Sequence, residues 1–212
     1  MKDLAIIIPC RNEGVSILNI LRRLKKNYII LINDASTNNT LKKIIKSKKL
    51  NIITNSKKIG YEGSIIKGIK IIKKKYNSNI KYILTMDADG DHNPYYVRKI
   101  YNKIKKLNCD LIIGNRTKKN RKSEELISNL FMKKYNLKDP LSGFKIYKKK
   151  KLYKVVSECT KKYFLVDLCI LFLKHHFKIV NMSINTKKNS SRRPRVNQKT
   201  VNKKILSIKN LI

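Results

Sequence analysis

The most concentrated chemistry in this sequence is a run of three aspartates at alternate positions, Asp87, Asp89 and Asp91, followed by His92. Only 13 of the 212 residues are acidic, so three acids within five positions require an explanation. Carboxylates this close repel one another unless a cation offsets their charge, and such hard oxygen ligands suit Mg²⁺ or Mn²⁺ completed by substrate phosphates. The spacing therefore predicts a divalent cation site. The alternative is a solvated acidic turn that caps the helix after Pro94.

A second group of candidates consists of arginines in a chain that uses lysine almost everywhere else. Arg116 follows an apolar run, Arg121 lies close behind it, and Arg192 and Arg193 fall in a basic stretch near the C-terminus. A guanidinium can bind a phosphate group through two parallel hydrogen bonds. Arg116 is therefore a candidate for binding a diphosphate. For Arg192 and Arg193 the choice lies between a flap over phosphate groups and a solvated basic tail.

Weaker candidates follow other apolar runs. Asp34 could accept hydrogen bonds from a nucleotide base, or it could cap a helix of its own. Glu13 could line a ligand, or it could be a first-turn acid that the helix dipole favours. The pair Gly60 and Gly63 would allow the backbone to approach a ligand, although it does not form a known phosphate-binding loop. The residues alone leave both interpretations open in each case.

The elements that must position these candidates alternate regularly. Apolar runs are expected to form strands at 4–8, 28–33, 50–54, 80–86 and 109–113. Helical patterns separate them at 13–26, 36–48, 60–76 and 94–107. This alternation is typical of an α/β fold with a mostly parallel sheet flanked by helices, and such sheets bind ligands beyond the carboxyl ends of their strands. The candidate residues stand at those positions.

The pattern changes after residue 115. Further elements are expected as a helix at 124–136, a strand at 145–148, a helix at 163–174 and a strand at 178–184. The segment 185–199 lacks periodicity and is expected to be a flexible basic loop. A short basic amphipathic helix is expected over 200–212.

Composition limits the function classes. Lys and Arg number 51 against 13 acids, a net charge of +38, which suggests an anionic partner such as nucleic acid, a membrane surface or a phosphorylated substrate. Compositional drift explains the charge equally well, because the lysines are spread along the whole chain. The four cysteines form no regular pattern, which favours a reducing, cytoplasmic compartment. No stretch of 18 apolar residues occurs, so any membrane contact is expected to be peripheral.

Taken together, six strings in this sequence resemble family 2 glycosyltransferases of the GT-A fold. The strings are Ile6–Glu13, Ile32–Ser36, Gly60–Gly68, Met86–His92, Gly114–Arg116 and Asp139–Phe144. They occur in the family's order, and within the family the chain looks most like the dolichyl- or polyprenyl-phosphate hexosyltransferases. The resemblance implies a Rossmann-like, mostly parallel sheet. It also implies a nucleotide-sugar-binding and catalytic core at 1–149 and a C-terminal, acceptor-side extension at 150–212.

The resemblance assigns roles to individual residues. The nucleotide sugar would be bound by Pro9, Arg11, Glu13, Asp34, Gly63 and Asp87, with Arg192 or Arg193 on a loop that folds over it. Asp34 would contact the base. A divalent cation, Mg²⁺ or Mn²⁺, would be held on the diphosphate by Asp87, Asp89 and Asp91, the last standing where the subgroup often has Gln. Arg116 and Arg121 would bind phosphate of the donor or acceptor.

The resemblance also implies a mechanism in which Asp89, Arg116 and Asp139 are the candidate catalytic residues. The cation and Arg116 would neutralise the charge that develops on the leaving nucleoside diphosphate. A sugar hydroxyl acceptor needs a general base, whereas a lipid phosphate is already anionic. The Glu-Asp pair that other members use as a base is absent, and Asp139 is only a loose substitute. This absence favours a polyprenyl or dolichyl phosphate acceptor.

The expected function is therefore inverting transfer of a hexose from a GDP- or UDP-sugar to a lipid phosphate, with peripheral contact to an anionic membrane. Asn33 and Ala35 depart from the family's usual Asp and Gly. One alternative is a glycosyltransferase that acts on a glycan or protein. Another is a basic RNA-binding protein, although the aromatic residues are scattered and Trp is absent. A nucleotidyltransferase would carry a glycine-rich loop where Cys10–Glu13 stands.

Overall fold

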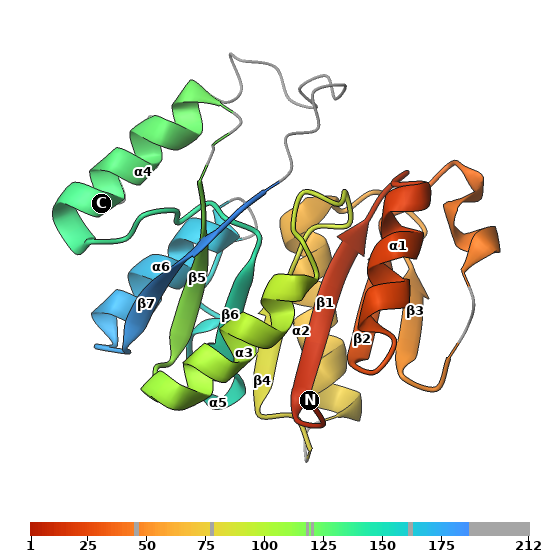
Figure 1. Cartoon of the computed structure of the whole chain (residues 1–212), viewed down its shortest axis with the longest axis horizontal. Helices are drawn as coiled ribbons and strands as arrows, with labels where there is room; N and C mark the ends of the chain where they lie inside the picture. Colours follow the sequence, from red (N-terminus) through yellow and green to blue (C-terminus); the bar gives the residue numbers. More distant parts are fainter. Residues whose placement is uncertain (45–46, 77–78, 118, 120, 161–162, 187–212) are drawn as a thin grey trace.

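The structure, a computed structural model, describes residues 1–44, 47–76, 79–117, 119, 121–160 and 163–186 (Figure 1). Its centre is a seven-stranded sheet with the strand order β3-β2-β1-β4-β6-β5-β7. The strands are β1 (Leu4–Cys10), β2 (Tyr28–Asn33), β3 (Leu50–Thr54), β4 (Tyr82–Thr85), β5 (Leu111–Arg116), β6 (Lys145–Lys148) and β7 (Ile179–Ile184). β6 runs antiparallel to both of its neighbours, and the other pairings are parallel. The expected mostly parallel sheet is confirmed.

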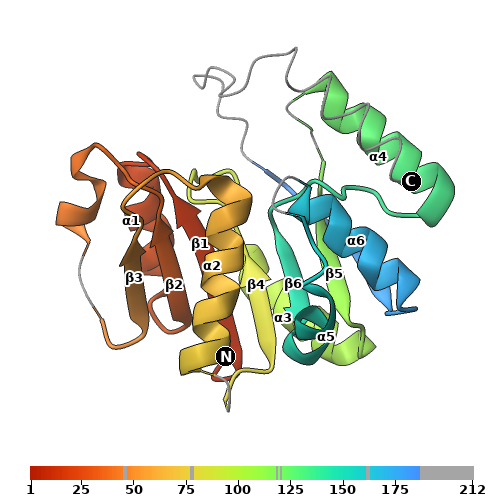
Figure 2. The ribbon, with the colours of Figure 1, turned by 180° about the vertical axis from the view of Figure 1, so that it is seen from behind.

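Helices cover both faces of this sheet. They are α1 (Val15–Leu24), α2 (Gly60–Lys75), α3 (Tyr95–Leu107), α4 (Lys122–Tyr135), α5 (Lys149–Val155) and α6 (Phe164–Lys174). α1 and α3 lie on one face in Figure 1, and α2, α5 and α6 lie on the other face in Figure 2. α4 lies at the outer end of the sheet, beyond the tips of β5 and β7, in both views. The sheet is thus the middle layer of three.

Alternation along β1 explains why the core has two halves. Ala5 and Ile7 join the cluster that α2 and α6 cover, whereas Ile6 and Ile8 join the cluster beneath α1 and α3. Successive side chains of a strand point to opposite faces, so a strand buried on both faces is apolar throughout. α2 approaches especially closely at Gly68, where a Cβ atom would lie 2.6 Å from Ile7 Cγ2.

The prediction of a helix at 36–48 is wrong. The described residues there form only a 3₁₀ turn, η1 (Asn39–Lys43). The residues that were expected to start the helix instead bind the loop after β1. Asn12 Oδ1 accepts a hydrogen bond of 2.9 Å from the Thr37 backbone N–H, and Ser36 Oγ accepts one of 3.1 Å from the Asn12 N–H. These bonds tie the segment to the loop after β1. The short helix α5, directly after β6, was not expected.

Elements from both sides of the expected division at residue 149 share one sheet. β7 pairs in parallel with β5 along its whole length. α6 contributes Phe164, Leu168 and Phe172 to the half of the core that α2 and α6 cover. The division itself stays a prediction. The expected helix at 200–212, and the expected loop from residue 187 onwards, lie outside the described residues. Within the described ranges, none of the helices combines the length and the apolar character needed to cross a bilayer.

Candidate active site

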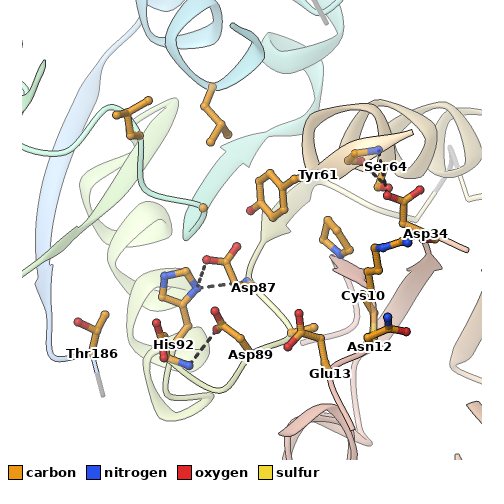
Figure 3. Close-up of a pocket in the computed structure, with 18 of the residues that line it drawn as sticks. Cys10, Asn12, Glu13, Asp34, Tyr61, Ser64, Asp87, Asp89, His92 and Thr186 are labelled. Carbon is orange, nitrogen blue, oxygen red and sulfur yellow. Dashed lines mark hydrogen bonds and ion pairs between the residues drawn. The ribbon is translucent and has the colours of Figure 1, made fainter. Parts of the chain in front are cut away.

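A cleft of about 770 Å³ opens at the carboxyl edge of the parallel strands (Figure 3). Its lining includes most of the residues that the sequence singled out: Pro9, Arg11, Glu13, Asp34, Asp87, Asp89, Asp91, Arg116 and Arg121. Two others, Gly63 and Asp139, do not line it. Arg192 and Arg193 lie outside the described residues. Segments more than 100 positions apart in the chain therefore meet at one place, as the rule for parallel sheets requires.

Asp34 anchors one side of the cleft through its carboxylate. Oδ1 accepts hydrogen bonds from Asn55 Nδ2 at 3.0 Å and from the Ile59 N–H at 2.7 Å, and Oδ2 accepts one from the Gly60 N–H at 2.9 Å. Asp34 thus caps the start of α2, a helix distant in sequence, where the helix dipole favours a negative charge. Lys67 Nζ donates to Asn55 Oδ1 at 2.6 Å and extends this network.

Arg11 ties together the loops that follow β1 and β2. Its Nη1 donates to the backbone carbonyl of Asp34 at 2.7 Å and to that of Ala35 at 2.9 Å. Ala35 has a φ of 50°, so the chain turns sharply at this point and directs both carbonyls towards the guanidinium. The loop that carries Pro9 to Glu13 is therefore fixed against the loop that carries Asp34.

The acidic run folds into a compact turn after β4. His92 is 2% exposed and packs against Phe144, with 5.3 Å between ring centroids, and its Nδ1 accepts the Asp87 backbone N–H at 3.2 Å. Asp89 Oδ1 accepts the Asp91 N–H at 3.0 Å. Burial lowers the pKa of His92, so the imidazole stays neutral and its Nδ1 stays an acceptor. His92 therefore orients the turn on which the aspartates stand.

The carboxylates of this turn fit an open cation site. In the described part of the chain, no three His, Cys, Asp or Glu side chains are arranged as a complete ligand set. Asp87 and Asp89 nevertheless line the same cleft, Asp87 is 31% exposed through its side chain, and its buried Oδ1 has no hydrogen-bond partner. Mg²⁺ and similar ions often use one or two carboxylates together with substrate phosphates. The donors suit such a cation, and the roles of the three aspartates as ligands stay predictions.

Arg116 occupies the opposite side of the cleft between two carboxylates. Its Nε donates to Asp139 Oδ2 at 2.8 Å and its Nη2 to Asp139 Oδ1 at 3.0 Å, and the Arg116 backbone N–H also donates to Oδ2. Its Nη1 lies 3.1 Å from Glu124 Oε2. Burial would raise the pKa of Asp139, but the hydrogen bonds and charge of Arg116 outweigh it and hold that pKa below its usual value. Because Asp139 is fully buried behind Arg116, its geometry suits a positioning role.

The segment that carries Asp139 is fixed by a buried lysine that the sequence did not reveal. Lys145, at the start of β6, is fully buried, and its Nζ donates to the backbone carbonyls of Pro140 and Ser142, each at 2.7 Å. Burial lowers the pKa of Lys145. In a chain with so many lysines, nothing in the residue type marks this one, since its role depends on the loop folding back over it.

Tyr61 and Gly143 complete the floor of the cleft, and neither contact was foreseen. A Cβ atom on Gly143 would overlap both Asp87 Oδ1 and Tyr61 Oη. The absence of a side chain at residue 143 therefore lets the carboxylate and the phenol approach the loop. The Tyr61 hydroxyl is buried, and burial followed by the charge of Asp87 raises its pKa well above the usual value. Tyr61 thus stays protonated next to Asp87 (Figure 3).

A cleft of this kind, at the carboxyl edge of a parallel sheet that one antiparallel strand interrupts, defines the GT-A class of glycosyltransferases. Solved structures of that class share the fold of this chain. A crystal structure of glucosyl-3-phosphoglycerate synthase from Mycobacterium tuberculosis with phosphoglyceric acid superposes with a TM-score of 0.73, at 14% identity, over 97% of this chain and 79% of that one. The same enzyme with Mn²⁺ and UDP-glucose gives 0.72, at 12% identity, over 98% and 76%.

The family follows from the sequence comparison. The model for glycosyl transferase family 2 matches residues 5–180, so the chain belongs to glycosyl transferase family 2. A UDP-N-acetylglucosamine–dolichyl-phosphate N-acetylglucosaminyltransferase of Methanococcus voltae is 29% identical over 189 residues, 74% of this chain and 73% of that protein. An uncharacterized protein of Methanocaldococcus jannaschii is 34% identical over 134 residues, 59% of this chain and 57% of that protein. The chain thus spans little more than half of the latter relative.

Proposed function

We propose that this chain transfers a hexose, with inversion, from a UDP-sugar to a polyprenyl or dolichyl phosphate, with the help of a divalent cation. The observation that carries the proposal is the meeting of three features in one cleft: the Asp34 network, the acidic turn of Asp87 and Asp89, and Arg116. Membership of family 2 supports glycosyl transfer. The Methanococcus voltae relative, by its name, uses UDP-N-acetylglucosamine and dolichyl phosphate, which supports this donor and acceptor class.

The hydrogen bonds of Asp34 favour a uridine nucleotide over a guanosine nucleotide. Oδ1 already accepts two hydrogen bonds, and Oδ2 accepts one, which leaves Oδ2 better able to accept another. Uracil presents a single N–H donor on its pairing edge, which one oxygen can accept. Guanine presents two adjacent donors, which require both oxygens of a carboxylate. The neighbouring structures with UDP-glucose are consistent with this choice.

In the proposed reaction, a phosphate oxygen of the acceptor attacks the anomeric carbon from the face opposite the diphosphate. The bond from that carbon to the diphosphate oxygen breaks, and the electron pair leaves with UDP. When bound, the cation would neutralise charge on the diphosphate. Asp87, Asp89 and Asp91 would hold it, Arg11 and Asp34 would hold the nucleoside, and Arg116 would bind a phosphate group. Because a phosphate acceptor is already anionic, no general base is required.

Exposed apolar side chains support a lipid acceptor and peripheral contact with a membrane. The large apolar side chains that the described residues expose are Val15, Ile59, Tyr95, Leu126 and Met132. The first three stand at the starts of α1, α2 and α3, which follow parallel strands and so begin at the carboxyl edge, and the other two lie on α4. Three of the five thus lie at the edge of the sheet where the cleft opens, on the side from which an acceptor lipid would enter.

A thermal-shift panel tests the proposal. UDP- and GDP-sugars are added with and without Mn²⁺ to the wild type, to Asp89→Ala and to the control Glu158→Ala, whose side chain is 53% exposed and does not line the cleft. We expect a UDP-sugar with Mn²⁺ to raise the melting temperature of the wild type and the control, and Asp89→Ala to lose the metal-dependent part. The proposal is wrong if no sugar nucleotide stabilises the wild type with metal present. Steep loss of RNA binding with salt, independent of Mn²⁺, would instead favour the RNA-binding alternative.

A second candidate, transfer to a hydroxyl of a glycan or protein, is favoured by one observation. Glu124 places a carboxylate in the cleft beside Arg116, and a hydroxyl acceptor requires a general base there. The role of Glu124 therefore decides between the two acceptor classes.

A further inference from the structure

We propose that Glu124 stands in the position that the acceptor's phosphate takes on Arg116, so that a phosphate monoester binds by displacing this carboxylate. The inference rests on the proposed function and deepens it. It makes Glu124 a determinant of acceptor class, because a phosphate dianion can replace a carboxylate on a guanidinium, whereas a neutral hydroxyl group cannot.

The two carboxylates on Arg116 differ in burial and in access to the cleft. Asp139 takes the edge formed by Nε and Nη2 and is completely buried, on a segment whose carbonyls Lys145 fixes. Glu124 contacts Nη1, retains 17% exposure of its side chain and lines the cleft. An anion that enters the cleft can therefore exchange with Glu124, whereas Asp139 stays in place and keeps the guanidinium oriented.

The start of α4 offers further donors to an incoming phosphate. Arg121, the residue before the helix, lines the cleft, and its side chain makes no capping hydrogen bond to the helix. The N–H groups of a helix start favour an anion. Arg121 and the helix start, in the same cleft as Arg116, together have the chemistry of a phosphate subsite.

The charge balance also favours exchange over base catalysis. Two carboxylates share one guanidinium, so a phosphate that approaches Arg116 meets the negative charge of Glu124 unless that carboxylate moves away. A general base must instead face the acceptor's hydroxyl proton. Glu124 faces the guanidinium, so its observed contact is the one that a phosphate would replace.

The test compares Glu124→Gln with Glu125→Gln, an adjacent and exposed acid whose loss changes the net charge equally. The amide oxygen of Glu124→Gln can still accept from Arg116, and equal melting temperatures will verify that both variants fold. Calorimetry, with UDP and Mn²⁺ present, measures the affinity for a short-chain prenyl phosphate, for the matching prenol and for inorganic phosphate. Steady-state kinetics with the prenyl phosphate give kcat and KM.

We expect Glu124→Gln to bind the prenyl phosphate about tenfold more tightly, and to lower its KM to match, because a charged competitor has been removed. The prenol should show no gain, and Glu125→Gln should behave like the wild type. A gain with inorganic phosphate as well would locate the effect at the headgroup, whereas a gain shared by the prenol would locate it at the lipid chain and contradict the inference.

Other outcomes overturn the inference. An unchanged or weaker affinity of Glu124→Gln for the prenyl phosphate would show that the carboxylate does not compete. A fall in kcat of about a hundredfold or more at constant KM would identify Glu124 as a general base and the acceptor as a hydroxyl. These failures are separate from failure of the proposed function, which would appear as absent stabilisation by sugar nucleotides in the wild type.

Discussion

The two sides of the cleft are built from different kinds of interaction. On the side formed by β1, β2 and α2, the carboxylate of Asp34 is held chiefly by backbone N–H groups at the start of a helix. On the side formed by β5, β6 and α4, Arg116 is held by the side-chain carboxylates of Asp139 and Glu124. Backbone donors are fixed once the fold forms, whereas a partly exposed side-chain pair that lines the cleft can exchange partners. Under the proposed function, the fixed side suits the nucleotide, and the side that can exchange partners suits the phosphate of the acceptor.

The largest effect should come from the buried pair. Asp139→Asn leaves Arg116 without its main partner, and we expect the free energy of unfolding to fall by about 3 kcal/mol, measured by urea denaturation. Glu124→Gln weakens the less buried contact of the same guanidinium and keeps an oxygen that can accept from Arg116, so it should cost less, about 1 kcal/mol. Equal costs would contradict the distinction between a fixed and an exchangeable carboxylate.

The stability lost in Asp139→Asn should depend on pH. Arg116 holds the pKa of Asp139 below its usual value. The contribution of Asp139 to stability is therefore complete above the unfolded-state pKa of about 4, and it is lost as the pH falls through the lower folded-state pKa. The difference in stability between the wild type and Asp139→Asn should therefore shrink below about pH 4. A difference that persists undiminished in acid would show that the charge of Asp139 is not what stabilises the pair.

An intermediate effect is expected on the nucleotide side. Asp34→Asn replaces one oxygen with an N–H₂ group that faces the backbone donors of Ile59 and Gly60, and one donor loses its partner. We expect a loss of about 2 kcal/mol in stability, together with weaker UDP binding by calorimetry. Glu62→Gln removes an acid from the same first turn of α2 and serves as the control, with an expected cost below about 1 kcal/mol. The backbone network would be unimportant if both substitutions cost the same.

The smallest effect on stability should come from the floor between the two sides. Gly143→Ala would push the side-chain ends of Asp87 and Tyr61 aside without removing any functional group. We expect the joint affinity for Mn²⁺ and UDP to fall about tenfold, measured by calorimetry. The free energy of unfolding should fall by only about 1 kcal/mol, because the ends of two side chains must shift. In the control Gly63→Ala, the new Cβ would meet Ile59 at 3.4 Å, an ordinary contact outside the cleft. Unchanged affinity in Gly143→Ala would argue against Asp87 as a cation ligand.

Much of the fold and part of the site could be predicted from the sequence. Runs of mainly apolar residues made all seven strand regions recognisable, and the residues just after the parallel strands had to meet at one edge. The acidic turn stood out because acids are rare in this chain, and Arg116 stood out because lysine is the common cation. The position of Asp34 was found, but the helix that it caps was not, because α2 begins 26 positions later.

The residues that were missed depend on contacts between distant segments. Lys145 is one of many lysines in this part of the sequence, so its type does not mark it. Only the folded loop from Asp139 to Phe144 gives it a role. Glu124 was expected simply as the first residue of a helix, and no spacing relates it to Arg116. The helix expected at 36–48 failed because side-chain contacts with Asn12 hold that segment in another conformation.

The reversed direction of β6 has a consequence for how this enzyme family can diversify. A parallel strand reaches the cleft with its last residue, but an antiparallel strand reaches it with its first, so the chain segment that leads into β6 arrives at the cleft from outside. Residues 136–143 can thus be exchanged without rethreading the parallel strands, provided that Asp139 and Gly143, which hold Arg116 and admit Asp87, are kept. Because Leu141 of this segment lines the cleft, exchanging the segment between relatives is a direct way, under the proposed function, to alter acceptor choice.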